Sequence, residues 1–336
     1  SASPYVVTAE AAFGLPTGLA PVDDDNVSPR VALAYDLRGD GRAVLRAGAG
    51  YFYGRVPYVI GGNVQQTVLP VLTLTCSGSI ADGDPDAPPD PSPYGTWSAG
   101  GESNPTGCAG AAGVGGVPTY TFWNPDFEYP ETFKANLGHE RAIGRSTRLA
   151  VDLVYSRSTK LYTVRNVNLR DPQFTLDGEG GRRVFQPAGV FSPGGTSTNY
   201  LRNTEFADVY VNYADGQARS AALTVEASRR LGERTTVRAS YTYVNAYDNS
   251  SYSCCTANSG YTNPNVGAFG PNEVGGAGDD QRAWGPSDFT RNHTGVLSLT
   301  GRLPLDVQFS AFLRYQTGNA WTPEQSGDLN GDGIRF

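Results

Sequence analysis

The sequence predicts an all-β fold, an antiparallel transmembrane β-barrel with long external loops. Three observations lead to this prediction: four hairpins with alternating apolar and polar residues, strands of about ten residues, and hairpins with a short turn at one end and long loops at the other. Strict alternation gives each strand one apolar and one polar face. Strands of this length match a tilted membrane crossing, and short turns opposite long external loops are typical of outer-membrane barrels.

The first hairpin, residues 31–53, shows the pattern most clearly (VALAYDLRGDGRAVLRAGAGYFY). Every second residue of 31–37 and of 45–53 is apolar or tyrosine, whereas Arg46 lies on the opposite face. The connecting residues 38–41 (RGDG) tolerate positive φ, as a tight turn requires. We therefore expect two antiparallel strands joined by this turn.

Three further hairpins repeat the pattern. They pair residues 132–140 with 147–155, 220–228 with 235–247, and 294–302 with 306–316. The long segments between hairpins are rich in Gly and Pro and cover residues 54–131, 158–204 and 248–290. Shorter strand candidates lie at residues 5–11, 64–75, 119–123 and 209–213, the last of which we expect beside the third hairpin. The sequence thus predicts about eight to ten strands.

The two faces of these strands carry different side chains. On the loop side, the apolar faces end in Tyr51, Tyr53, Tyr155, Tyr241, Tyr243 and Tyr315, which we expect to form an aromatic girdle at the outer interface. The opposite faces carry Arg46, Arg148, Asp152, Glu226, Arg238 and Arg314, which would face the lumen.

A soluble β-sandwich or jelly roll is the alternative fold, because it would bury the apolar face in a core and leave the polar face in water. Long loops at one end only are unusual for a sandwich. Small residues on the apolar face, such as Ala47, Ala135 and Ala311, would also pack a core poorly. Both points favour the barrel.

Composition excludes several classes of function. The formal net charge of -7 argues against nucleic acid as a partner. No apolar run is long enough for a transmembrane helix, no signal-peptide pattern is expected in these residues, and no segment has convincing helical periodicity. The sequence contains no methionine, so we expect a processed or partial segment of a longer protein.

The four cysteines, Cys76, Cys108, Cys254 and Cys255, all lie in stretches rich in Gly, Pro and Ser. Four cysteines allow three pairings, of which we favour Cys76–Cys108 with a vicinal Cys254–Cys255 bond. Metal ligation is the alternative, but no CxxC spacing occurs. Disulfides imply an oxidising compartment.

Catalytic residues are not evident, and we expect that the protein is not an enzyme. Both histidines, His139 and His293, lie in predicted strands, and no Gly-rich run follows a strand and opens a helix as a phosphate loop does. Aromatic residues in the long loops form a candidate ligand-binding surface, and packing of the loops onto each other is an equal alternative. These residues are Tyr94, Trp97, Trp123, Tyr252, Tyr261 and Trp284.

Residues 328–333 (DLNGDG) match the first half of a calcium loop. Asp328, Asn330 and Asp332 would supply oxygen ligands at alternate positions, and glycine permits the sharp turn. The acidic residue expected at the twelfth position would lie beyond Phe336, and the alternative is an ordinary turn in an external loop. Calcium is the only cofactor that the sequence indicates.

Four segments resemble, in their order, the barrel of TonB-dependent outer-membrane receptors of the Oar-like group. They are SPRVALAYDLRGDGRAVLRAGAGYFYGR, FKANLGHERAIGRSTRLAVDLVYSRS, LTVEASRRLGERTTVRASYTYVNAYD, and SDFTRNHTGVLSLTGRLPLDVQFSAFLRYQTGNAWTP followed by DLNGDGIRF. The resemblance implies a bacterial outer-membrane location and a 22-stranded barrel that encloses a plug. Because no plug, no TonB-binding segment and no final strands are found in residues 1–336, we expect a partial barrel domain.

The resemblance implies a receptor or transporter that binds a ligand with its loops and moves it through the lumen, by import or export, when the TonB complex acts on the plug. Outer-membrane lipid, the TonB complex and an unidentified siderophore, glycan or peptide are the implied partners. A passive porin-like barrel and a secreted or surface β-sandwich adhesin are the two alternatives.

Overall fold

The computed structural model describes residues 11–15, 22–55, 120–177, 182–193, 199–249, 284–287, 290–303, 305, 307–320 and 331. Their strands are β1 (Arg30–Asp36), β2 (Ala43–Tyr53), β3 (Tyr120–Trp123), β4 (Glu131–Ile143), β5 (Thr147–Asn166), β6 (Phe174–Leu176), β7 (Arg182–Val184), β8 (Val209–Leu231), β9 (Thr235–Asp248), β10 (Gly285–Pro286), β11 (His293–Arg302) and β12 (Gln308–Gln316). All four predicted hairpins are confirmed.

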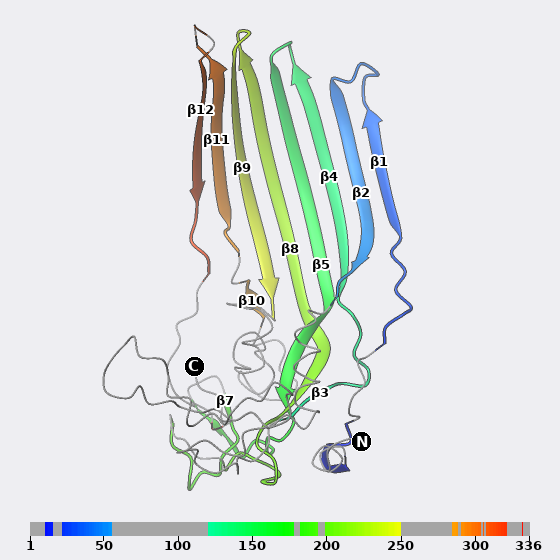
Figure 1. Cartoon of the computed structure of the whole chain (residues 1–336), viewed down its shortest axis with the longest axis vertical. Coiled ribbons are helices and arrows are strands. Elements are labelled where there is room, and N and C mark those ends of the chain that lie inside the picture. Colours follow the sequence, from blue (N-terminus) through cyan, green and yellow to red (C-terminus); the bar gives the residue numbers. More distant parts are fainter. Residues whose placement is uncertain are drawn as a thin grey trace, which may run out of the picture.

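Ten of these strands form one sheet, in which eight follow the order β1-β2-β4-β5-β8-β9-β11-β12 with antiparallel pairing throughout. β10 pairs with β9, and β3 pairs with β8. The tight turns gather at one edge of the sheet, and β3, β7, β10 and the ends of β5 and β8 lie at the other (Figure 1). The predicted asymmetry between turns and long loops is therefore a property of the fold.

The turn of the first hairpin shows why its residues fit. Gly39 and Gly41 adopt φ of 73° and 69°, a region that L side chains rarely occupy. The Asp36 carboxylate accepts hydrogen bonds from the backbone N–H of Arg38 at 3.1 Å and of Gly41 at 2.6 Å. The strands then pair with Leu33 opposite Ala47, so that the apolar positions of both share one face.

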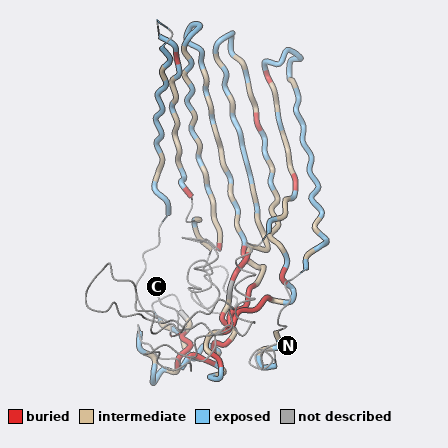
Figure 2. The backbone as a smooth tube through the Cα atoms, viewed as in Figure 1, coloured by how far each residue is buried: buried red, intermediate tan, exposed pale blue. Residues whose placement is uncertain are grey.

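That apolar face is not covered by another layer of the described structure. Large hydrophobic side chains on it remain open, for example Val31 at 70% and Leu153 at 48% exposure. Buried residues gather instead beyond the loop ends of the strands (Figure 2). A sheet in water would bury such a face, whereas a sheet in a bilayer presents it to lipid.

Four predicted girdle tyrosines form a line that crosses the hydrogen-bonded register at an angle. Tyr51 shares its register row with Arg157 of β5 and Tyr247 of β9. Tyr155 lies two residues, and Tyr243 four residues, closer to the turns than that row.

The line continues to β12, where Tyr315 shares the row of Tyr241, six residues from Tyr247. The shift is thus one residue for each step between strands. With roughly 3.3 Å per residue and 4.8 Å between strands, this shift corresponds to a strand tilt of roughly 35°. Outer-membrane barrels have tilts of this size, so the line is level in a membrane.

Strands β5 and β8 continue past the predicted hairpins, which corrects two predictions. Residues 158–166, expected in a long loop, extend β5, and residues 209–213, expected as a separate strand, begin β8. The pairing shifts register between Ser158 and Leu161, where Lys160 has a φ of 56° and its ammonium pairs with Glu128. The two strands bend at this bulge and leave the plane of the wall (Figure 1).

The strand extensions, β3 and the β6–β7 hairpin contribute to a folded outer cap, defined here as residues 120–129, 161–177, 182–193 and 199–216. The predicted strand at residues 119–123 is confirmed as β3, which pairs with β8 in parallel. One apolar cluster of the cap contains Tyr120, Phe122, Phe206, Val209 and Val211, and a second contains Leu169, Phe185, Tyr200 and Leu201.

The strand predicted at residues 5–11 is wrong at Ala11, which is helical; its other residues and the candidate at residues 64–75 fall outside the described part. Phe13 belongs to this helical turn and packs against Phe206 of the cap, with ring centroids 5.5 Å apart. A helix in this position lets the aromatic ring reach the apolar cluster. Within the described ranges, no helix has the length and apolar character needed to cross a membrane.

Candidate functional site

The polar face of the sheet carries many hydrogen-bonding side chains. Hydroxyl pairs bridge neighbouring strands: Thr132 with Ser158 at 2.9 Å, Ser156 with Ser220 at 2.7 Å, and Thr224 with Thr242 at 3.0 Å. Cross-strand pairs of this kind stabilise a sheet, and they also place polar atoms on the lumen side. We call this face the inner wall.

Ion pairs lie on the inner wall closer to the turns. Glu140 of β4 accepts from Arg46 of β2 at 3.2 Å and also pairs with Arg148 of β5. Glu226 pairs with Arg238 at 3.3 Å. One carboxylate thus serves two guanidinium groups, which leaves the wall with a local surplus of positive charge.

The surplus extends over the whole inner wall of the described strands, although the chain is acidic overall. Its basic residues are Arg30, Arg46, Lys134, Arg148, Arg230, Arg238, Arg302 and Arg314, and its acidic residues are Asp36, Glu140, Asp152, Glu226 and Asp248. Two of the cations lie over one ring at the loop end: Arg30 is 4.3 Å and Lys134 5.5 Å from the Phe52 centroid. Such a wall favours anionic groups beside it.

Two glycines of the inner wall leave room for side chains of the neighbouring strands. A Cβ at Gly138 would lie 2.4 Å from the Asp152 carboxylate, and one at Gly48 would lie 2.8 Å from the Asn136 side chain. Both glycines therefore leave room for a polar side chain of the neighbouring strand. The side chains of Asp152 and Asn136 remain exposed on the lumen side of the sheet.

The outer cap is centred on a buried asparagine that sequence reasoning missed. The Asn168 side chain is fully buried and donates to the backbone carbonyls of Asn203 at 2.9 Å, Phe206 at 3.2 Å and Ala207 at 2.6 Å. Its Oδ1 accepts from the backbone N–H of Asn203 at 2.9 Å. One side chain thus fixes the segment that leads into β8. Asn166 and Asn168 form an N-x-N pair in the sequence, but this pattern alone does not distinguish a buried network from a turn.

A second polar group joins the extensions of β5 and β8 to each other inside the cap. Asp215 of β8 pairs with Arg165 of β5 and accepts from the Thr163 hydroxyl. The Arg165 guanidinium also lies 4.4 Å from the centroid of the Tyr213 ring. These contacts lie directly beyond the bulge, so they hold the bent ends of β5 and β8 together.

Asp208 of the cap accepts a hydrogen bond from the Asn166 side chain at 2.7 Å, and we expect it to make the stability of the cap depend on pH. Burial raises the pKa of its carboxyl, and hydrogen bonds from Tyr210, Asn166 and Tyr200 offset this only in part. The Asp208 carboxyl therefore binds a proton more tightly in the folded cap than in the unfolded chain. The stability of the cap is highest below the ordinary carboxyl pKa and falls as the pH rises through the elevated folded-state pKa.

We expect Asp208→Asn to flatten this acid-range pH dependence, because the amide does not ionise. Thermal unfolding of the cap, followed by near-UV circular dichroism across weakly acidic pH, measures it. Asp171→Asn is the matched control, since Asp171 is an exposed carboxyl of the cap. An unchanged pH slope in Asp208→Asn would contradict the assignment.

Two of the six aromatic residues predicted to form a ligand-binding surface lie in the described part of the structure. Trp123 is only 7% exposed and packs edge-on against Phe127 at 4.6 Å, inside the cap. Trp284 is half-buried and stacks on Tyr247 with centroids 6.4 Å apart. Tyr94, Trp97, Tyr252 and Tyr261 fall outside the described residues, and the ligand surface stays a prediction.

The cysteine and calcium predictions also fall outside the described part, at Cys76, Cys108, Cys254, Cys255, Asp328, Asn330 and Asp332. Gly331, within the calcium motif, is described. It has a φ of 69°, and a Cβ there would lie 2.7 Å from Cγ of the buried Gln186. Glycine at this position therefore allows the backbone of residue 331 to approach the Gln186 side chain closely.

Neither histidine belongs to a catalytic or metal constellation in the described structure. His293 begins β11, as predicted, and its Nδ1 lies 2.6 Å from the Tyr241 hydroxyl. His139 lies in β4 opposite Leu45 and Val151, on the apolar face. Among the described residues, no three His, Cys, Asp or Glu side chains are grouped as a metal site.

Together, an uncovered apolar face, a tilted tyrosine line and a charged inner wall define the class of protein as a membrane β-barrel. The comparison with protein families agrees: residues 2–335 match the family described as "Outer membrane beta barrel domain". The chain belongs to this family. It lies in the bacterial outer membrane and contacts its lipid with the apolar face, so the soluble sandwich alternative is wrong.

A solved outer-membrane transporter has a similar fold. The outer membrane transporter YddB from Escherichia coli is 13% identical, with a TM-score of 0.50 over 88% of this chain and 29% of that chain. The FrpB iron transporter from Neisseria meningitidis (F3-3 variant) is 10% identical, with a TM-score of 0.43 over 91% of this chain and 30% of that chain. A search of curated proteins found no match. The chain thus spans less than a third of the length of these transporters, and the likeness shows the fold alone.

Proposed function

We propose that this chain is part of the barrel of a TonB-dependent receptor or transporter, which binds a ligand at its outer cap and moves it through the lumen. The observation that carries the proposal is the continuity of β5 and β8, which run from the inner wall into the cap without interruption. A ligand bound at the cap would therefore lie at the mouth of the basic inner wall. The basic surplus favours an anionic ligand or a ligand with acidic groups.

The larger barrel is also a proposal. In the described structure, β1 and β12 each pair with one neighbour only and form the two edges of the wall. Unpaired backbone groups in hydrocarbon cost several kcal/mol each, on the order of a lost hydrogen bond or more, so membrane sheets close. Further strands, up to the 22 that the Oar-like resemblance implies, would complete the barrel around a plug that the TonB complex moves.

The rival proposal is a passive porin-like barrel with an open lumen. The inner wall is compatible with it, because porins also line their lumen with polar side chains. The folded cap beyond the wall favours the receptor, since ligand-binding loops need a scaffold that positions them. Passage of a solute across the outer membrane is the function that both candidates share.

Liposome swelling and TonB crosslinking separate the two candidates. The protein that contains this chain is reconstituted in vesicles and challenged with a small neutral sugar. We expect no swelling, because a plug fills the lumen, and we expect a formaldehyde crosslink to TonB in cells. Swelling equal to that of a porin control, with no crosslink to TonB, would overturn the receptor proposal.

A further inference from the structure

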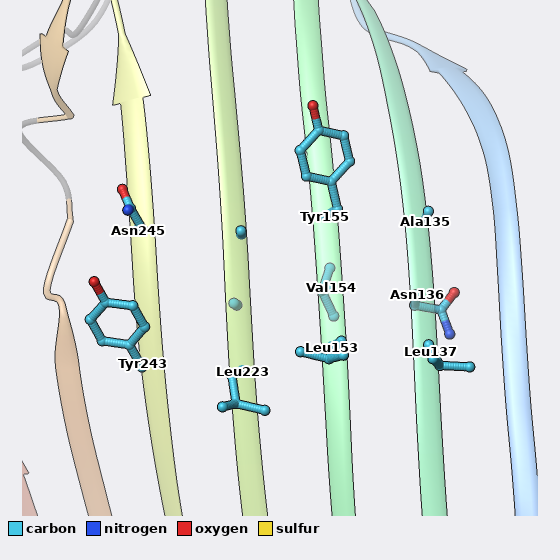
Figure 3. A pocket seen from close by; sticks show the side chains of 11 residues that line it. Ala135, Asn136, Leu137, Leu153, Val154, Tyr155, Leu223, Tyr243 and Asn245 are labelled. Atoms are coloured by element: carbon cyan, nitrogen blue, oxygen red, sulfur yellow. The ribbon is translucent and has the colours of Figure 1, made fainter.

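The lipid-facing side of the sheet has an open hollow of about 460 Å³ over β4, β5, β8 and β9. Tyr155 stands between Ala135 and Ala221 in one register row, so a large ring has a small neighbour on each side. Leu137, Leu153 and Leu223 form the next row toward the turns. Figure 3 shows these side chains along the strands, with the Tyr155 hydroxyl directed toward the loop ends. The hollow is an apolar groove with a polar tip at its outer end.

Two arginines stand directly beyond the groove on the same face. Arg157 pairs with Arg219 across β5 and β8, in the row next to Tyr155 and Ala221. Both are exposed, and neither forms an ion pair in the described part of the chain. Like charges directly opposite each other destabilise a sheet. An anion held between the two guanidinium groups would remove this repulsion.

Two aromatic rings lie beside Arg219, one member of this arginine pair. The Arg219 guanidinium lies 5.4 Å from the centroid of Tyr247 and 5.4 Å from that of Trp284. These contacts fix Arg219 at the outer end of the face while its N–H groups remain available. Tyr and Trp with a polar tip are typical of the level at which headgroups meet acyl chains.

The tyrosine line places the arginines at the depth of the headgroups. Arg157 lies two residues beyond Tyr155, which marks the line on β5. Arg219 lies three residues beyond the level that the same line reaches on β8. At roughly 3.3 Å per residue this is a height of about 5–10 Å, the thickness of one headgroup layer.

We propose that the groove and this arginine pair together form a binding site for an anionic phospholipid. Its headgroup phosphate would lie between Arg157 and Arg219, and an acyl chain would lie beside Tyr155 in the groove. Planar guanidinium groups bind phosphate oxygens in pairs of charge-assisted hydrogen bonds. A zwitterionic headgroup such as phosphocholine carries a cation beside its phosphate, which the two arginines repel, so a headgroup with a net negative charge is preferred. The site is separate from the inner wall and needs neither a ligand nor TonB.

Lipid retention tests the proposal. The protein is placed in nanodiscs of phosphatidylcholine with a minor fraction of phosphatidylglycerol, extracted with detergent, and examined by native mass spectrometry. We expect several-fold lower retention of phosphatidylglycerol in the double variant Arg157→Gln with Arg219→Gln. A second variant, Ala135→Leu with Ala221→Leu, fills the groove, keeps both charges and should lower retention as well.

The matched control is Arg145→Gln with Arg234→Gln, which makes the same change of charge in exposed turns at the opposite edge. It should retain lipid as the unaltered protein does. Inorganic phosphate is added in a parallel arm and should not displace the lipid. Equal retention by the Arg157 and Arg219 variant, equal retention of phosphatidylcholine, or loss of lipid to inorganic phosphate alone would each overturn the proposal.

Discussion

Replacement of Leu153 by arginine is expected to destabilise the folded barrel by about 1–2 kcal/mol, because a cation on the lipid face costs about 2–4 kcal/mol at the bilayer midplane and less toward the interface, and Leu153 lies two residues inside the tyrosine line. Leu153 lies in β5 between Leu137 and Leu223, in a row of apolar side chains, and is 48% exposed. In the bilayer its surroundings are acyl chains, which offer no partner to a guanidinium group. Urea unfolding in phospholipid vesicles measures the change in the free energy of unfolding.

The neighbouring residue supplies a closely matched control. Val154 is 44% exposed, also apolar, and lies in the same strand, but it faces the inner wall opposite Asn136 and Ala222. Val154→Arg should therefore change the free energy of unfolding by less than about 1 kcal/mol, since the new charge lies among polar groups. If the two variants lose equal stability, the assignment of lipid and lumen faces is wrong.

The second large effect concerns the outer cap. Asn168→Leu should destabilise the cap by at least about 3 kcal/mol, because buried groups left without partners cost about 1–3 kcal/mol each. The variant would leave three backbone carbonyls and one N–H without the side chain that binds them. Hydrogen exchange should then become faster in β3 and at residues 199–211, while β4 and β9 keep their protection.

Two variants sharpen this test. Asn168→Asp keeps the acceptor for Asn203 but removes the donors, so it should destabilise the cap even though its shape is conserved. Asn136→Ala, at an exposed asparagine of β4, should leave hydrogen exchange of the cap unchanged. Uniformly faster exchange in the wall and the cap after Asn168→Leu would show that the cap is not a separate unit of stability.

The sheet was predictable from the sequence because its rule is local. Alternation assigns each side chain of the first hairpin to a face, and the RGDG turn fixes which residues pair, so Leu33 meets Ala47 as the pattern requires. The tyrosine line was predictable as a girdle for the same reason. Its slope was not, because the slope depends on the register between hairpins that long loops separate in sequence.

The cap was not predictable for a physical reason. Its residues satisfy one another over long distances in sequence, as Asn168 does with Asn203 and Asn212 with Phe122, so no short pattern marks them. The bulge at Lys160 also hid the continuation of β5, because it breaks the alternation there. Arg157 and Arg219 were missed because an arginine on an apolar face breaks the alternation that defined the face.

The continuity of β5 and β8 through the bulge determines how a molecule could enter. Thr163 pairs with Tyr213 and Asn166 with Tyr210, so the ladder is still intact inside the cap. A hinged lid would have to break these pairs each time it opened. The part of the cap built on β5 and β8 is therefore a continuation of the wall, and in the proposed receptor a ligand would pass a fixed rim and not a moving lid.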